Sequence, residues 1–182
     1  MARVFFALQP DPPSLAGLRR IQQDALPRSA ALRLVSPRSI HLTLAFLGER
    51  SEDDIAALID AASPITLAPM TQPITGWLWL PSVERPRVLA LGVAADAALE
   101  SLAEQLWHVL DQLGLRRPER ALLPHVSLAR MRGNIVPGTL ESPPIFDLGW
   151  AALGLFASRL TPAGPRYQAL WSVASGQSSG QT

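Results

Sequence analysis

Two residue types are missing from this 182-residue chain: it has no cysteine and no lysine, so all sixteen basic residues are arginine. Without cysteine there can be no thiol nucleophile, disulfide, iron–sulfur cluster or cysteine-ligated zinc. Without lysine, Schiff-base enzymes, lysyl-nucleotide ligases and P-loop nucleotide hydrolases are excluded, because each of them uses the lysine amine. The chemistry of this protein must therefore depend on other side chains.

Long apolar runs and a strong net charge are also missing. No segment approaches the roughly 18 consecutive apolar residues of a membrane span, and the first apolar run meets Gln9 and Pro10 too soon for a signal sequence. We therefore expect a cytoplasmic monomer that does not enter a membrane. The formal net charge of +1 argues against electrostatic binding along a nucleic acid and favours recognition at one point.

The apolar pattern predicts an α+β protein built on antiparallel sheet. Strands are expected near residues 3–8, 32–34, 40–48, 74–80, 87–93, 122–130, 148–160 and 167–173. Helical spacing predicts helices over 15–25, 51–62 and 96–113. A long loop is expected over 133–144. We expect one bilobed domain over residues 1–173 and a mobile tail over 174–182, where Ser, Gly and Gln dominate.

A short repeat links the two halves of the chain. His41-Leu42-Thr43-Leu44 and His125-Val126-Ser127-Leu128 share the order His, aliphatic, hydroxyl, Leu, and alanine follows each of them. Each copy lies in a strand-like run. Two related lobes would explain the repeat.

In a strand, alternate side chains point to opposite faces, so His41 and Thr43 project together, and so do His125 and Ser127. An imidazole beside a hydroxyl, twice over, suits acid–base work on a phosphodiester. One imidazole takes a proton from water, the other protonates the leaving oxygen, and the hydroxyls donate to phosphoryl oxygens. A lone strand histidine is more often a half-buried structural residue, but matched tetrapeptides holding two of only three histidines favour function.

Other interpretations of the histidines are weaker. A zinc site is disfavoured because the chain has no cysteine, no His-Glu-x-x-His spacing and no acidic residue within either tetrapeptide. A serine hydrolase is disfavoured because the chain has no Gly-x-Ser-x-Gly elbow. We therefore expect no metal and no cofactor. The third histidine, His108, falls on the polar face of its helix and should be a surface residue.

Further candidates surround the two motifs. Arg130 ends the second strand-like run, where its forked donors could bind a phosphate. Four aromatic side chains are candidates for stacking on a base. They are Phe46, Trp77, Trp79 and Tyr167. For each of the four taken alone, core packing is the alternative.

With both motifs in view, the chain resembles the 2H phosphoesterase superfamily, and within it the RNA 2′,3′-cyclic phosphodiesterases formerly called 2′-5′ RNA ligases. The resemblance covers nearly the whole chain. It is carried by residues 3–8, 41–48, 86–93, 124–130 and 158–167, in that order. Ser127 departs from the threonine usual in this subfamily, but it keeps the hydroxyl.

The resemblance implies a bilobed fold with a pseudo-twofold cleft and a metal-independent hydrolysis of RNA or nucleotide 2′,3′-cyclic phosphates to 2′-phosphomonoesters. It implies that His41 is the proton donor and His125 the proton acceptor, since the near-symmetric motifs cannot assign these roles. It also implies that Arg130 binds phosphate and that Phe46 contacts the nucleotide. A reversible, ATP-independent joining of RNA through a 2′-5′ linkage would be the same chemistry run backwards.

Two alternatives stay open from the sequence. One keeps the site but changes the substrate to another small cyclic phosphate, such as an ADP-ribose cyclic phosphate. The other is a catalytically inactive RNA-binding module that retains the motifs.

Overall fold

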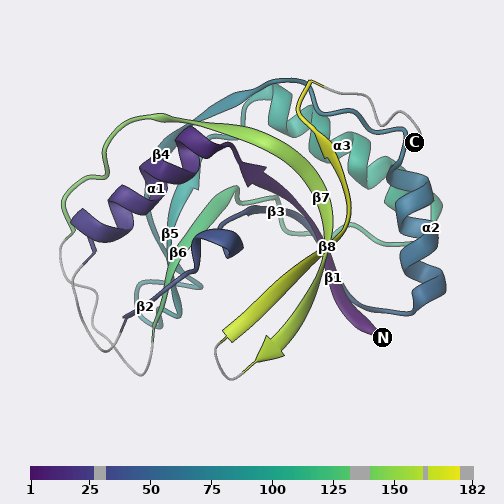
Figure 1. The fold of residues 1–182 in the computed structure, drawn as a ribbon, viewed down its shortest axis with the longest axis horizontal. Coiled ribbons are helices and arrows are strands. Elements are labelled where there is room, and N and C mark those ends of the chain that lie inside the picture. The colour runs from purple at the N-terminus through teal and green to yellow at the C-terminus, as the bar shows by residue number, and fades with distance from the viewer. Residues whose placement is uncertain (27–31, 132–139, 162–163, 177–182) are drawn as a thin grey trace.

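The computed structural model describes residues 1–26, 32–131, 140–161 and 164–176 (Figure 1). The strands in this part of the chain are β1 (Ala2–Pro10), β2 (Leu32–Leu34), β3 (Leu42–Arg50), β4 (Thr71–Leu80), β5 (Val88–Val93), β6 (His125–Met131), β7 (Asp147–Thr161) and β8 (Gly164–Ala174). The helices are α1 (Pro12–Asp24), α2 (Glu52–Ala62) and α3 (Ala97–Gln112), with a short 3₁₀ helix, η1, over Pro37–Ser39.

The strands form one antiparallel sheet in the order β1-β3-β6-β5-β4-β7-β8, and β2 adds to the edge of β6. β7 also pairs with β1, so that the sheet curves round and closes on itself. β3 and β6 meet through the single pair Leu42 and Val126. This narrow junction separates one group of strands (β1, β3, β7, β8) from another (β2, β4, β5, β6). The predicted α+β fold on antiparallel sheet is confirmed.

The helices begin where their capping residues predict. Asp11, Ser51 and Asp96 each accept a hydrogen bond from the backbone N–H three residues on, which satisfies an otherwise unpaired donor. α3 ends before Gly114, whose φ of +75° is the left-handed conformation that favours glycine. Figure 1 shows α2 and α3 on one side of the molecule and α1 on the other. α2 packs on α3, while α1 packs on β6 and β7.

One apolar core joins the sheet to the helices. Among its fully buried side chains are Phe6, Leu8, Leu18, Leu42, Leu89, Leu106 and Leu128. The apolar residues of both motifs are buried, which leaves the alternating motif positions for the opposite face; they are Leu42, Leu44, Val126 and Leu128. No helix in the described residues is long and apolar enough to cross a membrane.

The strands differ from expectation at their ends. β3 begins at Leu42 and β6 at His125, each later than the apolar pattern predicts. Pro124 has no N–H to donate to a ladder, and η1 occupies the turn before β3. β7 and β8 are longer than expected because their pairing continues to Thr161 and Gly164.

Two predicted irregular segments lie partly beyond the described residues. The loop expected over 133–144 is described only from residue 140 onward. Of the tail expected over 174–182, Ala174 belongs to β8 and the Gly176 N–H donates to the Leu67 carbonyl at 2.8 Å. Residues 177–182 lie outside the described part of the chain.

Candidate active site

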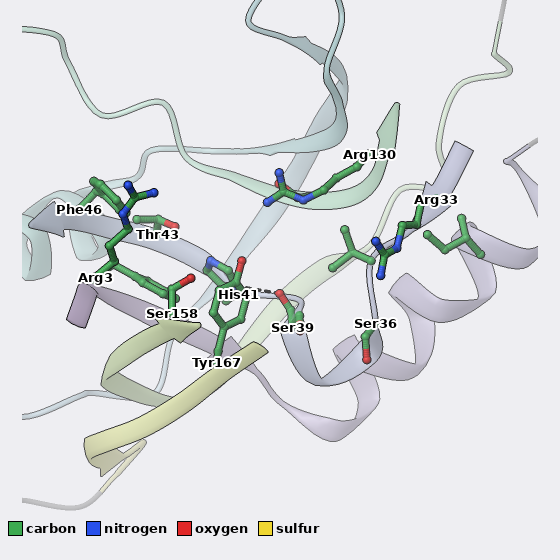
Figure 2. Close-up of a pocket in the computed structure, with 14 residues that line it drawn as sticks. Arg3, Arg33, Ser36, Ser39, His41, Thr43, Phe46, Arg130, Ser158 and Tyr167 are labelled. Carbon is green, nitrogen blue, oxygen red and sulfur yellow. Dashed lines mark hydrogen bonds between the residues drawn. The ribbon is translucent and has the colours of Figure 1, made fainter. Parts of the chain in front are cut away.

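A cavity of about 470 Å³ opens at the junction of β3 and β6 (Figure 2). Its walls come from β1, β2, β3, β6, β7 and β8 and from the turn around η1, so both halves of the chain contribute. The lining residues include His41, Thr43, Phe46, Ser127, Arg130 and Tyr167. Five of the six residues predicted from the motifs therefore line one cavity; the sixth, His125, is not among its lining residues.

The strand register brings the two motifs face to face. Leu42 is opposite Val126 in an antiparallel pair, which places His41 beside Ser127 and Thr43 beside His125. Each histidine thus has the hydroxyl of the other motif as its neighbour across the strands. The same register places the two imidazoles on one face of the neighbouring strands.

Both imidazoles are held in the same way. Nδ1 of His41 donates to the Ser39 carbonyl at 2.8 Å, and Nδ1 of His125 donates to the Leu123 carbonyl at 2.7 Å. A carbonyl only accepts, so Nδ1 carries a hydrogen in both rings. Nε2 of each neutral ring therefore keeps its lone pair and can act as a base, whereas in the protonated ring it can act as an acid.

Aromatic rings enclose His41. Its ring centroid lies 4.9 Å from that of Phe5 and 5.1 Å from that of Tyr167, whose ring is nearly perpendicular to it. The pKa of His41 falls to about 4, mainly because of this burial; the hydrogen bond to Ser39 opposes the fall, and the positive charges of His125 and Arg130 add to it. The imidazole is consequently neutral at pH 7.

The cavity is positively charged. Three arginines line it, Arg3, Arg33 and Arg130, and no aspartate or glutamate is among the lining residues. Arg3 lies 3.6 Å from the Glu49 carboxylate. Sequence reasoning found Arg130 but missed Arg33, because only the pairing of β2 with β6 places Arg33 opposite Arg130. A cavity of this charge suits an anion.

The aromatic candidates divide into two pairs. Phe46 is 62% exposed and lines the cavity, as does Tyr167. Trp77 and Trp79 instead pack against the core, and the Trp77 indole donates to the Glu141 carbonyl at 2.7 Å. For these two, the core-packing alternative is the correct one. Sequence reasoning also missed that Tyr167 packs on His41, a contact that depends on the β7–β8 hairpin.

His108 does not line the cavity, and the described residues contain no cluster of metal ligands. His108 is exposed on α3, where it hydrogen-bonds Gln112 at 3.1 Å, as expected of a surface residue. Within the described ranges, no three His, Asp or Glu side chains gather in the way a metal ion would require.

The chain is similar to proteins of one family. A family model described as LigT like Phosphoesterase matches residues 8–90. An RNA 2′,3′-cyclic phosphodiesterase of Thermus thermophilus is 31% identical over 75% of this chain and 72% of its own length. One of Archaeoglobus fulgidus is 28% identical over 92% of this chain and 97% of its own length.

Solved structures agree with the sequence relatives. Escherichia coli LigT complexed with 3′-AMP superimposes with a TM-score of 0.75 at 27% identity, covering 97% of this chain and 99% of that one. The fold, the order of the two histidine motifs and the sequence similarity all lead to the same assignment. The chain belongs to the LigT-like phosphoesterase family of the 2H superfamily.

Proposed function

We propose that this chain hydrolyses the 2′,3′-cyclic phosphodiester at the end of an RNA to a 2′-phosphomonoester, by acid–base catalysis between two histidines and without a metal ion. Curated relatives at moderate identity over most of the chain carry the name RNA 2′,3′-cyclic phosphodiesterase. The observation that carries the proposal is the facing register of the two motifs, with both Nδ1 atoms bonded to carbonyls, beside an arginine-lined cavity.

In the proposed mechanism, Nε2 of His125 takes a proton from water as the water oxygen attacks phosphorus. The bond from phosphorus to O3′ breaks, and O3′ takes the proton from Nε2 of His41, whose imidazolium form the bound phosphate stabilises. The product has a 2′-phosphate and a free 3′-hydroxyl. Which histidine donates is inferred from the family resemblance, because the register alone is symmetric.

The other motif residues stabilise the charge that develops on the phosphoryl oxygens. Thr43 and Ser127 donate hydrogen bonds, and the Arg130 guanidinium neutralises charge at the same group. Phe46, exposed at the cavity, supplies a face on which the terminal base stacks. These assignments are consistent with the lining of the cavity, which holds all four side chains.

A joining reaction belongs to the same proposal. An RNA 5′-hydroxyl in place of water would join two RNA ends through a 2′-5′ linkage, with the strained cyclic phosphate as the energy source. The absence of lysine from the chain supports an ATP-independent route, because a lysyl-nucleotide intermediate cannot form. We place this activity in a cytoplasmic monomer.

The test is hydrolysis of a short RNA with a 2′,3′-cyclic phosphate end in excess EDTA, with the 2′- and 3′-phosphate products separated chromatographically. We expect turnover with only the 2′-phosphate formed. Exclusive 3′-phosphate would reverse the assignment of the leaving oxygen. Failure of the folded protein to act would favour another small cyclic phosphate or a binding role.

A further inference from the structure

Two arginines face each other across neighbouring strands at the cavity. Arg33 of β2 is directly opposite Arg130 of β6 in the antiparallel register, and both line the cavity. Like charges directly opposite each other in a sheet are destabilising. The structure therefore holds two positive charges at a place where folding alone would favour one or none.

Neither charge is balanced by a neighbouring carboxylate. In the described part of the chain, ion pairs form at Arg3 and Arg117, and none forms at Arg33 or Arg130. The cavity lining contains no acidic residue. An anion bound between or beside the two guanidiniums would relieve their repulsion, because each offers a fork of N–H donors to phosphate oxygens.

The segment that carries Arg33 is fixed in place. Nε2 of the buried Gln22 donates to the carbonyls of Val35 and Leu128, at 2.9 and 2.8 Å, and so ties the end of β2 to β6. The Val35 N–H donates to the same Leu128 carbonyl at 2.8 Å. This anchoring sets the position of Arg33 beside β6 before any ligand binds.

Arg33 lies away from the reacting centre. Along β6, Arg130 is three residues, or about 10 Å, from Ser127, and Arg33 is opposite Arg130 on β2. Figure 2 shows Arg33 on one side of His41, with Thr43 and Phe46 on the other. Arg130 can reach toward the reacting phosphate, whereas Arg33 borders a part of the cavity that the mechanism leaves unused.

We propose that Arg33 binds the phosphate on the 5′ side of the terminal nucleotide, so that the site prefers RNA ends over cyclic mononucleotides. An RNA end carries this second phosphate one nucleotide from the cyclic one, and a cyclic mononucleotide with a free 5′-hydroxyl lacks it. The inference rests on the proposed function, since it takes the reacting phosphate to lie at the two motifs. Arg33 is then the residue by which the site distinguishes an RNA end from a cyclic mononucleotide.

The test compares adenosine 2′,3′-cyclic phosphate with its 5′-phosphorylated form in the wild type, Arg33→Ala, Arg130→Ala and Arg87→Ala. We expect the wild type to favour the 5′-phosphorylated substrate roughly tenfold in kcat/KM, the size of one charge-assisted contact. Arg33→Ala should bring this ratio close to one. Arg130→Ala should lower kcat/KM for both substrates and keep the ratio.

Arg87→Ala is the matched control. Arg87 is exposed, precedes the residue that pairs with Arg130 and does not line the cavity, so its removal takes away one nearby positive charge without touching the proposed subsite. We expect this variant to keep the wild-type ratio. A ratio near one in the wild type, or a tenfold ratio that survives in Arg33→Ala, would overturn the proposal.

A binding measurement separates this proposal from the catalytic one. Calorimetry with adenosine 2′-phosphate and adenosine 2′,5′-bisphosphate tests the subsite without turnover. The second ligand should bind the wild type roughly tenfold more tightly, and this gain should disappear in Arg33→Ala. If neither substrate is hydrolysed, the proposed function fails while the binding ratio still decides the subsite. Equal binding of both ligands by the wild type would reject the subsite even in an active enzyme.

Discussion

The two copies of the motif are alike in how they hold the imidazole and different in what surrounds it. In both, Nδ1 donates to the carbonyl two residues earlier, which points Nε2 away from the backbone. His41 is packed between Phe5 and Tyr167 and its pKa falls to about 4, whereas the hydrogen bond of His125 lies in an exposed setting. The two motifs thus orient their imidazole rings in the same way. The side chains around each ring differ, and this difference is what distinguishes His41 from His125.

The largest expected effect comes from removing either imidazole. His41→Ala and His125→Ala should each lower kcat by roughly 100-fold or more, since each removes a general acid or base. The measurement is turnover of an RNA with a 2′,3′-cyclic phosphate end. His108→Ala, which removes the exposed histidine of α3, should leave turnover unchanged. Full hydrolysis in both motif variants would contradict the two-histidine mechanism.

The pH dependence of the free energy of unfolding should distinguish His41, which packs between aromatic rings, from His125. Because the pKa of His41 is about 4 when folded and about 6.5 when unfolded, the unfolded chain binds more protons between these values. Stability contributed by neutral His41 is present above pH 6.5 and is lost as pH falls toward 4, by up to about 3 kcal/mol.

Urea unfolding at pH 7 and pH 4.5 measures this loss. His41→Gln should reduce the difference between the two pH values, and His125→Gln, at the matching position of the other motif, should keep most of it. An equal reduction in both variants would show that the two copies have similar surroundings.

Arg130 and Phe46, which follow the two motifs, should affect different kinetic constants. Arg130→Ala should lower kcat/KM about 30-fold, because it removes a charge-assisted contact to phosphate. Phe46→Ala should raise KM about fivefold with little change in kcat, because stacking on a base acts on bound substrate and transition state alike. Steady-state kinetics with an RNA end distinguishes the two. A kcat effect at Phe46 as large as that at Arg130 would reject this division.

The proton-donor role requires the pKa of His41 to rise when an anion binds. A phosphate beside the ring favours the imidazolium, and we expect a rise of about one unit or more from the value near 4 in the empty cavity. NMR titration of the His41 ring in the absence and presence of adenosine 2′-phosphate measures the shift. An unchanged pKa would assign the base role to His41 and the acid role to His125.

The smallest effect is expected where the two copies differ by one methyl group. Ser127→Thr should change kcat/KM by less than about twofold, because the hydroxyl that donates to phosphate is kept. Ser127→Ala, which removes the hydroxyl, should cost about tenfold. A large loss in the threonine variant would show that the cavity is fitted to the smaller side chain.

Much of the fold could be predicted from local signals. Asp96 as N-cap and Gly114 as terminator bound α3 because capping depends on backbone groups within a few residues. The ends of β3 and β6 could not be predicted from apolar pattern, since the residues before them are apolar but lie outside the ladder. The position of Arg33 opposite Arg130 and the contact of Tyr167 with His41 could not be predicted, because they depend on the pairing of β2 with β6 and of β8 with β7.

The sequence by itself determined which groups can do chemistry: two imidazoles, each two positions before a hydroxyl residue, in a chain without cysteine or lysine. Alternation along a strand also decided that each pair shares a face. Only the tertiary structure decided that His41 faces Ser127, that aromatic rings pack against His41, and that Arg33 lies opposite Arg130. These contacts join residues far apart in the chain, and strand register, which the whole core sets, decides them.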